Sequence, residues 1–282
     1  MAVSIMKKLL WLCVGFCPAV VMAQTYPSKP VRLIAASSPG SAVDIVSRVI
    51  AQKLSEQLGQ QVVVDNRAGA GGNLGAELAA KAAPDGYTVF MATPAQAINT
   101  GLYRKLDYDL VRDFSPVSQL TVGHYCVAVH PSLPVQSVKE LIALARARRG
   151  QLNYASAGNG NATHLAGELF TSMAKIELVH VPYKGSGPGL TDLIGGQVNY
   201  CFETMTAATP HVKSGKVVAL AQTRTKRAKG HPTVPTMDEQ GLAGFEVTQW
   251  YGIYGPAGLP PAITARYTAD FNKALSDPGI RD

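Results

Sequence analysis

Two short loops rich in serine and glycine have the residue types of an anion-binding site. The first runs Ser-Ser-Pro-Gly-Ser-Ala over residues 37–42, and the second runs Ser-Ala-Gly-Asn-Gly-Asn over residues 156–161. Each loop follows a short apolar run and precedes a segment with helical periodicity. Such a turn presents unpaired backbone N–H groups and the positive end of a helix dipole at the carboxyl end of a strand, where a carboxylate is stabilised.

The first loop is framed by strand and helix signals. Residues 31–35 are too apolar for an exposed strand, and Ser41 with Asp44 three residues later matches a helix capping box. Gly59 stands where a left-handed residue commonly ends a helix. The helix between these signals carries an apolar stripe formed by Val46, Ile50, Leu54 and Leu58.

The second loop repeats this arrangement in the other half of the chain. Residues 152–155 form a short apolar run, and Leu165, Ala166, Leu169 and Phe170 share one face of the helix that follows. Most strand-to-helix turns of α/β proteins bind nothing, so a single loop of this kind would be weak support for a site. Two such loops, one in each half, suggest two lobes that face one ligand.

From residue 61 onward, strands and helices alternate in the rhythm of a doubly wound parallel α/β sheet. We predict that each half of the chain holds its own sheet. The predicted strands cover residues 61–65, 87–92, 114–120, 124–130, 152–155, 178–181, 198–203, 217–222 and 249–254. The predicted helices cover residues 72–83, 96–102, 138–147, 163–173, 188–194, 207–214 and 260–275, and residues 224–246 are predicted to form a loop.

The N-terminal residues 1–23 have the pattern of a secretory signal peptide. Two lysines precede an apolar stretch over residues 9–21, and the small residues up to Ala23 suit cleavage there. A membrane anchor is the alternative, but the stretch is short for a bilayer and Pro18 interrupts it. Removal of the two lysines lowers the formal net charge from +7 to +5. We therefore expect a soluble, exported protein.

The composition argues against several classes of protein. The chain is 46% hydrophobic and 16% charged, as in a soluble globular protein. The one dense basic run, residues 146–149, ends a helix and has no interleaved aromatic residues, so nucleic-acid binding is not expected. The six histidines lack metal-ligand spacing, and neither Cys126 nor Cys201 lies in a C-x-x-C pair. We expect no metal, no cofactor, and two buried free thiols unless their strands are neighbours.

Several sequence motifs occur in a fixed order along nearly the whole mature chain. They are Pro39-Gly40 with Asp44, Ala83-Pro-Asp-Gly-Tyr-Thr88, Val179-His-Val-Pro-Tyr-Lys-Gly185, and the runs at residues 26–34, 62–75, 152–160 and 164–170. Together these motifs resemble those of the Bug family, the periplasmic solute receptors of tripartite tricarboxylate transporters. The resemblance is specific for the family and does not specify a ligand.

The resemblance implies an α/β fold with two lobes, the type II periplasmic binding protein fold, in which each lobe is a doubly wound sheet. Two crossover strands would join the lobes as a hinge, near residues 121–125 and 246–250. Lobe 1 would comprise residues 24–123 and 249–282, and lobe 2 would comprise residues 124–248.

Two further expectations follow from the resemblance. The strands at residues 124–130 and 198–203 would be neighbours, which would bring Cys126 and Cys201 onto adjacent strands and make a disulfide possible. Family members usually continue past the position of Asp282, so lobe 1 is expected to be short at its C-terminal end. A native protein that ended there would have a marginally stable first lobe.

In the family, the two strand-to-helix loops hold a ligand carboxylate from both sides, largely through backbone groups and ordered water. The usual first loop resembles Pro-Phe-x-Pro-Gly-Gly, whereas here Ala36 and Ser37 replace the Pro-Phe pair and Ser41 replaces the second glycine. Charge-assisted bonds from backbone N–H groups can hold a carboxylate without any arginine. By position, the resemblance assigns this role to Ser37, Ser38, Pro39, Gly40, Ser41 and Ala42 and to Ser156, Ala157, Gly158, Asn159, Gly160 and Asn161.

Four more candidate ligand-binding residues lie at or just after the carboxyl ends of predicted strands, where an open sheet binds its ligands. They are Thr93, Tyr183, Glu203 and Thr204. For each of them the alternative is a turn residue that is solvated at the rim of the cleft. A Glu203 carboxylate that faces the cleft would favour a ligand with a cationic amine and disfavour a ligand with an additional negative charge.

These observations predict a receptor that closes two lobes on a small carboxylate and delivers it to the membrane subunits of a tripartite tricarboxylate transporter. Di- and tricarboxylates, amino acids and aromatic acids all fit this description. We expect a monomer in the periplasm that is not an enzyme. One alternative is an exported receptor that feeds a signalling partner. Another is an exported enzyme acting on carboxylates, for which only Glu203 and Asp44 qualify as general base.

Overall fold

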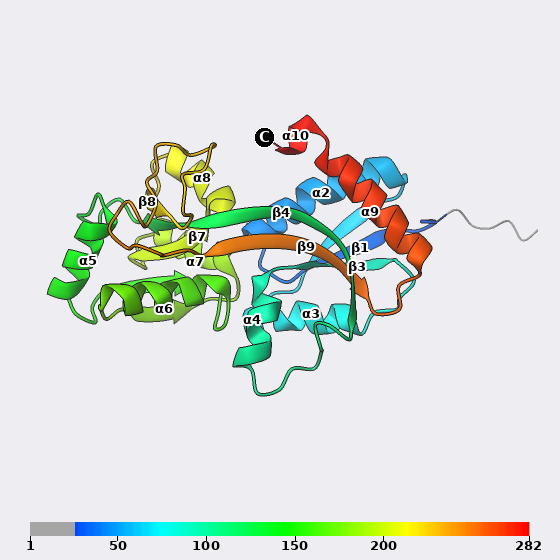
Figure 1. The fold of residues 1–282 in the computed structure, drawn as a ribbon, viewed down its shortest axis with the longest axis horizontal. Coiled ribbons are helices and arrows are strands. Elements are labelled where there is room, and N and C mark those ends of the chain that lie inside the picture. The colour runs from blue at the N-terminus through cyan, green and yellow to red at the C-terminus, as the bar shows by residue number, and fades with distance from the viewer. Residues whose placement is uncertain (1–25, 282) are drawn as a thin grey trace, which may run out of the picture.

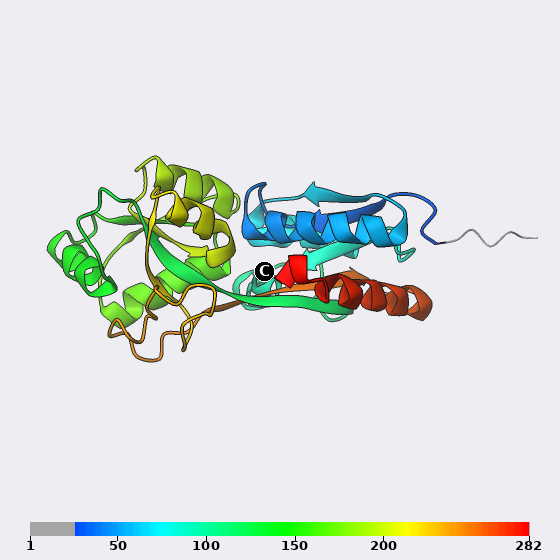
Figure 2. The same ribbon diagram turned by 90° about the horizontal axis from the view of Figure 1, so that it is seen from above.

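The computed structural model describes residues 26–281 and contains two α/β lobes that lie side by side (Figure 1). The strands β4 (Phe114–Val129) and β9 (Thr248–Pro256) connect the lobes, and the other elements of each lobe gather around its sheet (Figure 2). The predicted signal peptide lies outside the described residues. Within the described part, no helix combines the length and apolar character needed to cross a bilayer.

The first lobe is built on the parallel strands β1 (Val31–Ala35), β2 (Val62–Asn66) and β3 (Thr88–Ala92). β9 and β4 extend this sheet as antiparallel strands, in the order β2-β1-β3-β9-β4. The helical segments of this lobe are α2 (Ala42–Leu58), the 3-10 turn η1 (Ala70–Gly72), α3 (Asn73–Ala80), α4 (Pro94–Leu102), α9 (Pro261–Leu275) and α10 (Pro278–Arg281).

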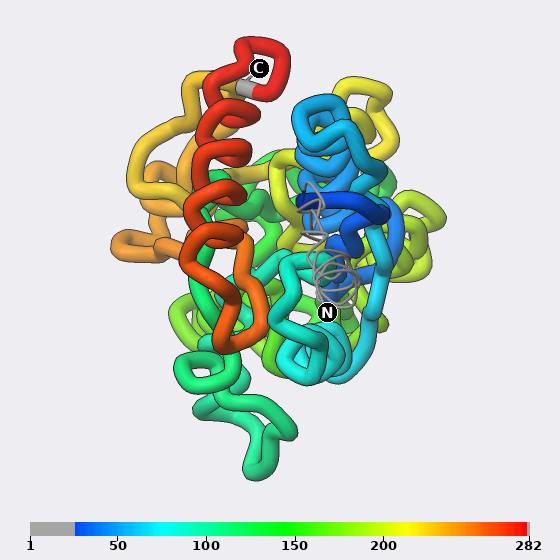
Figure 3. The backbone as a smooth tube through the Cα atoms, turned by 90° about the vertical axis from the view of Figure 1, so that its right-hand side faces the viewer, coloured from blue at the N-terminus to red at the C-terminus, as the bar shows by residue number. Residues whose placement is uncertain are grey.

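Helices cover both faces of this sheet, which explains why the central strands β1 and β3 are largely apolar. Leu33 packs into the core that Leu54 of α2 and Phe271 of α9 share, and Figure 3 shows α9 alongside α2. The neighbouring Ile34 points to the opposite face, where it packs with Phe90 in the core beneath α3. Successive side chains of a strand alternate between faces, so a central strand covered on both sides is rich in apolar residues on both faces.

The second lobe has the sheet order β4-β7-β5-β6, and β8 pairs with the other edge of β4. Its core contains a cluster of aromatic rings that includes Tyr154, Phe170, Tyr200, Phe202 and Phe245. The strands are β5 (Asn153–Ser156), β6 (Val179–Pro182), β7 (Tyr200–Thr204) and β8 (Val218–Gln222). The helices are α5 (Val138–Ala147), α6 (Ala162–Ala174), α7 (Ser186–Ile194) and α8 (Met205–Lys213).

β4 is one continuous strand of 16 residues, so the prediction of two strands at residues 114–120 and 124–130 was wrong at the break between them. The residues between the two predicted strands, Thr121, Val122 and Gly123, all pair with β9. Val122 is 62% exposed, so its side chain resembles that of a loop residue although its backbone belongs to the ladder.

β4 changes its partner strands between His124 and Tyr125. His124 pairs with Thr248 of β9, whereas Tyr125 pairs with Thr204 of β7. This point lies within the predicted crossing at residues 121–125. We therefore propose that the partner change of β4 marks the start of the predicted lobe 2, residues 124–248.

Cys126 and Cys201 lie on adjacent strands, as the resemblance implied. The register of β4 and β7 pairs Cys126 with Glu203 and Cys201 with Ala128, so the two cysteines are not directly opposite each other. Both thiols are free and buried. Burial, and then the negative charge of Glu203, raise the pKa of both thiols well above the usual range, which makes them poor nucleophiles.

His124, at the partner change of β4, has a buried imidazole that is only 9% exposed. Its Nε2 atom has no hydrogen-bond partner among the described residues. Burial first, and then the charges of Arg224 and His231, lower the pKa of His124 to about 4. The fold therefore favours the neutral form of this side chain.

This burial predicts that stability depends on pH. An unfolded histidine has a pKa of about 6.5, so between pH 6.5 and 4 the unfolded chain binds more protons than the folded chain. The stabilisation is complete above about pH 6.5 and is lost as the pH falls toward about 4. We expect the unfolding free energy to drop by about 1 to 3 kcal/mol from this residue alone.

The measurement is urea unfolding of the wild type and of His124→Leu at several pH values. The variant should lose less stability as the pH falls. Burial also lowers the pKa of His180 and of His231, so part of the slope will remain in the variant. Equal slopes for the two proteins would show that His124 does not take up a proton on unfolding.

Candidate functional site

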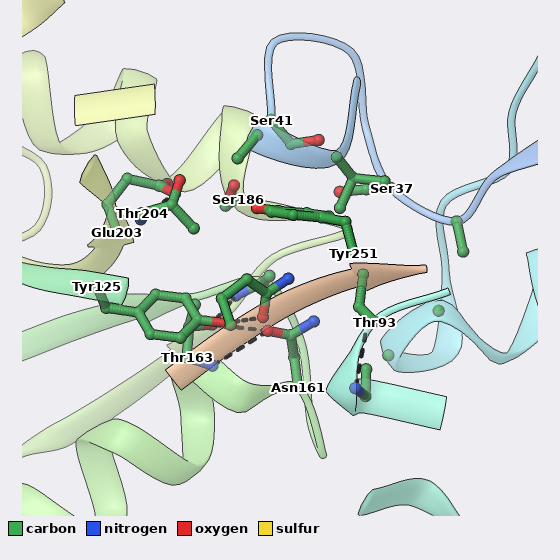
Figure 4. A pocket seen from close by; sticks show the side chains of 18 of the residues that line it. Ser37, Ser41, Thr93, Tyr125, Asn161, Thr163, Ser186, Glu203, Thr204 and Tyr251 are labelled. Atoms are coloured by element: carbon green, nitrogen blue, oxygen red, sulfur yellow. Dashed lines mark hydrogen bonds between the residues drawn. The ribbon is translucent and has the colours of Figure 1, made fainter. Parts of the chain in front are cut away.

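A cavity lies between the two lobes and is lined by residues from both of them (Figure 4). It contains about 420 Å³ of space between protein atoms, part of which is open to solvent. The first lobe contributes Ala36, Ser37, Ser41, Ala42, Val43, Gly71, Gly72, Thr93, Ala95 and Gln96. The second lobe and the crossover strands contribute Tyr125, Ala157, Asn161, Thr163, Ser186, Glu203, Thr204, Gln249 and Tyr251.

Six helices begin at this cavity. The residues that cap α2, α3, α4, α6 and α8 line it, as does the first residue of α7. These residues are Ser41, Gly72, Thr93, Asn161, Thr204 and Ser186. The positive ends of six helix dipoles therefore meet at one place, which favours a negative charge there. No lysine, arginine or histidine of residues 26–281 lines the cavity.

The first loop is held in shape by Asp44, as a helix cap requires. Ser41 Oγ accepts from Asp44 N (3.3 Å), and the Asp44 carboxylate accepts from Gly40 N (3.0 Å) and Asn66 Nδ2 (3.0 Å). Burial raises the pKa of Asp44, but hydrogen bonds from Arg48, Gly40 and Asn66 outweigh it and lower the pKa below its usual value. Asp44 does not line the cavity, so the cap accounts for it and a role as general base does not.

Four lining residues have a backbone N–H group without a hydrogen-bond partner among the described residues. Ala42 and Val43 belong to the first turn of α2, Gly71 belongs to η1, and Ser186 begins α7. The first three come from lobe 1 and the fourth from lobe 2. A carboxylate in the cavity would find donors on both sides.

In the second loop, most backbone N–H groups are already bonded within the loop and the helix after it. Ala157 N donates to Thr163 Oγ1 (2.9 Å), Gly158 N to Ser156 Oγ (3.2 Å), and Gly160 N to His164 Nδ1 (3.3 Å). The second loop therefore presents mainly the side chains of Asn161 and Thr163 to the cavity, rather than the row of amides that the resemblance implied.

Ser156 and His180 form a pair that resembles a nucleophile with its base, since Ser156 Oγ lies 2.5 Å from His180 Nε2. The His180 ring stacks on His164 at 4.2 Å, and burial followed by the charge of His164 lowers its pKa to about 4. Ser156 does not line the cavity, and no described residue bonds the other ring nitrogen of His180. The pair fixes the second loop and lacks the geometry of a catalytic site.

Within the described part of the chain, Glu203 is the only carboxyl group that lines the cavity, and it is 2% exposed. Its Oε1 accepts from Thr204 N (2.8 Å) and from Thr204 Oγ1 (3.1 Å). Burial raises its pKa above the usual value, against the opposing effect of these bonds and of a bond with Ser186.

Three lining residues on the crossover strands were missed by the sequence analysis. Tyr125 comes from β4, and Gln249 and Tyr251 come from β9. The Tyr125 hydroxyl donates to Gln249 Oε1. The Tyr251 hydroxyl is buried and makes no hydrogen bond of good geometry with a described residue, although the Gln249 side chain lies close to it.

The predicted site residues divide into two groups. Ser37, Ser41, Ala42, Thr93, Ala157, Glu203 and Thr204 line the cavity. Ser38, Pro39, Gly40, Ser156, Gly158, Asn159, Gly160 and Tyr183 lie outside its lining. Within the second group, the Tyr183 hydroxyl donates to Asp192 (2.6 Å). The roles of all these residues toward a ligand remain predictions. Asn161, the last residue of the predicted second loop, also lines the cavity. Thr163 and Ser186 were missed, although the rule that helix starts meet at the cavity would have selected them.

Most of the outer group lies where the two lobes touch. A Cβ atom on Gly187 would lie 2.5 Å from Pro39 O, and one on Gly71 would lie 2.5 Å from Asn159 O. Tyr103 of the first lobe also donates to Asn159 O at 3.2 Å. Each loop therefore seats against backbone of the opposite lobe, which is the arrangement of a closed cleft.

No group of His, Cys, Asp and Glu side chains among residues 26–281 has the geometry to hold a metal ion. The functional chemistry of the cavity is that of its helix ends, hydroxyls, amides and one carboxyl group.

Comparison with known proteins relates this geometry to a family. The family model described as tripartite tricarboxylate transporter family receptor matches residues 46–282. Protein BugT of Bordetella pertussis is 37% identical over 264 residues, which cover 93% of this chain and 81% of BugT.

Two solved structures from Rhodopseudomonas palustris are similar over most of the chain. Rpa4515 with adipate has a TM-score of 0.88 and 36% identity, and the match covers 90% of this chain and 85% of that one. MatC with bound malate has a TM-score of 0.86 and 32% identity, and the match covers 91% of this chain and 87% of that one. The two-lobed fold is therefore the type II periplasmic binding protein fold, and the chain belongs to the Bug family of tripartite tricarboxylate transporter receptors.

Proposed function

We propose that this protein is a periplasmic receptor that encloses a small carboxylate between its lobes and delivers it to the membrane subunits of a tripartite tricarboxylate transporter. One observation carries the proposal. The N-terminal ends of six helices, drawn from both lobes, meet at a single cavity without any basic side chain. Such a cavity favours an anion that accepts hydrogen bonds from the backbone.

The unpaired N–H groups indicate how the ligand would act on the lobes. Ala42 and Val43 offer donors from lobe 1, and Ser186 offers one from lobe 2. A carboxylate bound to both sets is stabilised only when the lobes are together, so it shifts the population toward the closed form. The bound adipate and malate of the two R. palustris relatives support a carboxylate as the ligand class.

A receptor must release its ligand chemically unchanged. The pair of Ser156 and His180 lies outside the cavity lining, so a ligand in the cavity would not meet a serine activated by a histidine. We propose a monomer that carries its ligand through the periplasm and binds without a cofactor.

A thermal-shift screen of small carboxylates tests the function. A ligand at about one hundred times its dissociation constant stabilises the folded state by about 2.7 kcal/mol, which raises the melting temperature by several degrees. We expect at least one carboxylate to produce this shift, the corresponding neutral amide to produce none, and the bound molecule to be recovered unaltered by mass spectrometry. Absence of any stabilising carboxylate, or recovery of a converted product, would contradict the proposal.

Gly187 provides a test of lobe closure. Its backbone lies outside the left-handed region, so alanine is tolerated in the helix, but the added Cβ would lie 2.5 Å from Pro39 O and 3.2 Å from Ser38 Oγ in the opposite lobe. We expect Gly187→Ala to weaken binding of the best carboxylate from the screen by about tenfold, which corresponds to about 1.4 kcal/mol. Isothermal titration calorimetry measures this change.

Gly101→Ala is the matched control. Gly101 lies in α4, which has nine residues, as does the helix α7 that contains Gly187. A Cβ atom on Gly101 would meet no atom within 4 Å. The control should bind like the wild type, and both alanine variants should keep the fold because alanine favours helices over glycine. Wild-type affinity in Gly187→Ala would show that binding does not require the contact between α7 and the first loop.

A further inference from the structure

The cavity combines two features that conflict for a ligand with two negative charges. Six helix ends favour an anion, yet the only ionisable acid or base among the lining residues, apart from tyrosines, is the carboxyl group of Glu203. A ligand with a carboxylate at each end would place one of them near this group. The conflict disappears if the ligand carries one negative and one positive charge.

Glu203 has no cationic partner among residues 26–281. Its bonds come from Thr204 N, Thr204 Oγ1 and Ser186, all of which are neutral donors. No described lysine, arginine or histidine contributes to the shift of its pKa. Burial is the main cause of the raised pKa of four neighbouring groups, and Glu203 is a smaller cause. These groups are Tyr125, Tyr251, Cys126 and Cys201, and none of them is a cation. The carboxyl group of Glu203 is therefore hydrogen-bonded, but no charged group among residues 26–281 pairs with it.

Tyr251 adds a second unused group at the same place. It is 2% exposed, lines the cavity, and its hydroxyl lacks a hydrogen-bond partner of good geometry among the described residues. In Figure 4 its side chain reaches from β9 toward the side of the cavity where Ser186 and Glu203 lie. Buried hydroxyl groups normally have a hydrogen-bond partner. The Tyr251 hydroxyl can therefore find its partner in a bound ligand.

The chemistry of this end of the cavity matches an ammonium group. An ammonium has three donors and no acceptor, and Glu203 and Tyr251 offer a carboxylate and a hydroxyl oxygen as acceptors. The faces of tyrosine rings attract cations, and Tyr125 and Tyr251 both lie within electrostatic reach of Glu203. Hydrogen bonds between a carboxylate and an ammonium are among the stronger ones in proteins.

We propose that the ligand is a zwitterion, whose carboxylate binds the helix ends and whose ammonium group binds Glu203 and Tyr251. The carboxylate half of this inference rests on the proposed function, whereas the ammonium half rests on the buried groups of β7 and β9. The ligand class is therefore an amino acid or another small amino-carboxylate.

The test compares ligands that differ only at one end. β-Alanine and succinate share a two-methylene chain, 4-aminobutyrate and glutarate a three-methylene chain, and 5-aminopentanoate and adipate a four-methylene chain. These pairs, together with the common amino acids, are titrated into the wild-type protein by calorimetry at pH 7.5. We expect the tightest ligand to carry an ammonium group and to bind at least tenfold more tightly than any diacid.

Two variants assign this preference to the proposed groups. Glu203→Gln keeps the shape and the acceptor for Thr204, and it should weaken the tightest amino-carboxylate by tenfold or more. Tyr251→Phe removes the unpaired hydroxyl, and it should weaken the same ligand severalfold. Glu177→Gln is the control, because it removes an exposed carboxylate that pairs with Arg149 on the surface of the same lobe. Its affinity should match that of the wild type.

The outcomes separate this inference from the proposed function. If the wild type binds a diacid more tightly than every amino-carboxylate, the zwitterion is overturned and the carboxylate receptor stands. Uptake of a proton with the diacid, or a gain of affinity for it in Glu203→Gln, belongs to this same outcome. Unchanged affinity of the amino-carboxylate in both Glu203→Gln and Tyr251→Phe would also overturn it. Binding of no amino-carboxylate and no diacid would contradict the proposed function itself.

Discussion

Unpaired backbone N–H groups at buried helix ends are the constraint on which the rest of this structure depends. An N–H group that is buried without an acceptor costs about 1–3 kcal/mol. Ala42, Val43, Gly71 and Ser186 each bring to the cavity an N–H group that has no partner among the described residues. Water satisfies such groups while a cleft is open, whereas a closed cleft must hold ordered water or a ligand that accepts. The helix ends also supply positive potential. An acceptor with negative charge therefore stabilises the closed form and needs no arginine.

The closed arrangement depends equally on small residues at the lobe interface. The first loop lies against Gly187 and the second lies against Gly71, at distances that leave no room for a side chain. Backbone therefore meets backbone on both sides of the cavity. Tyr103, which donates to Asn159 O, is the long side chain named at these contacts, so closure there orders few rotamers and its entropy cost is small.

Local signals in the sequence predicted the units of the fold, because apolar periodicity and capping residues such as Ser41 act within a few positions. The contributions of Tyr125 and Tyr251 could not be predicted in this way, since which side of a crossover strand faces the cavity depends on how the two lobes are placed. The amides of the second loop were expected to be free, but Thr163 and His164 turn back from the next helix and accept from them. These hydrogen bonds depend on side-chain geometry, which residue types alone do not specify.

The sharing of β4 between the two sheets has a consequence for how the molecule loses its structure. Residues 114–124 of this strand pair with β9, and residues 125–129 pair with β7 and β8. If one lobe melted alone, half of the same strand would lose its partners and expose an unpaired edge beside the intact half. The two lobes are therefore parts of one cooperative unit, which should melt in a single calorimetric transition despite their separate cores.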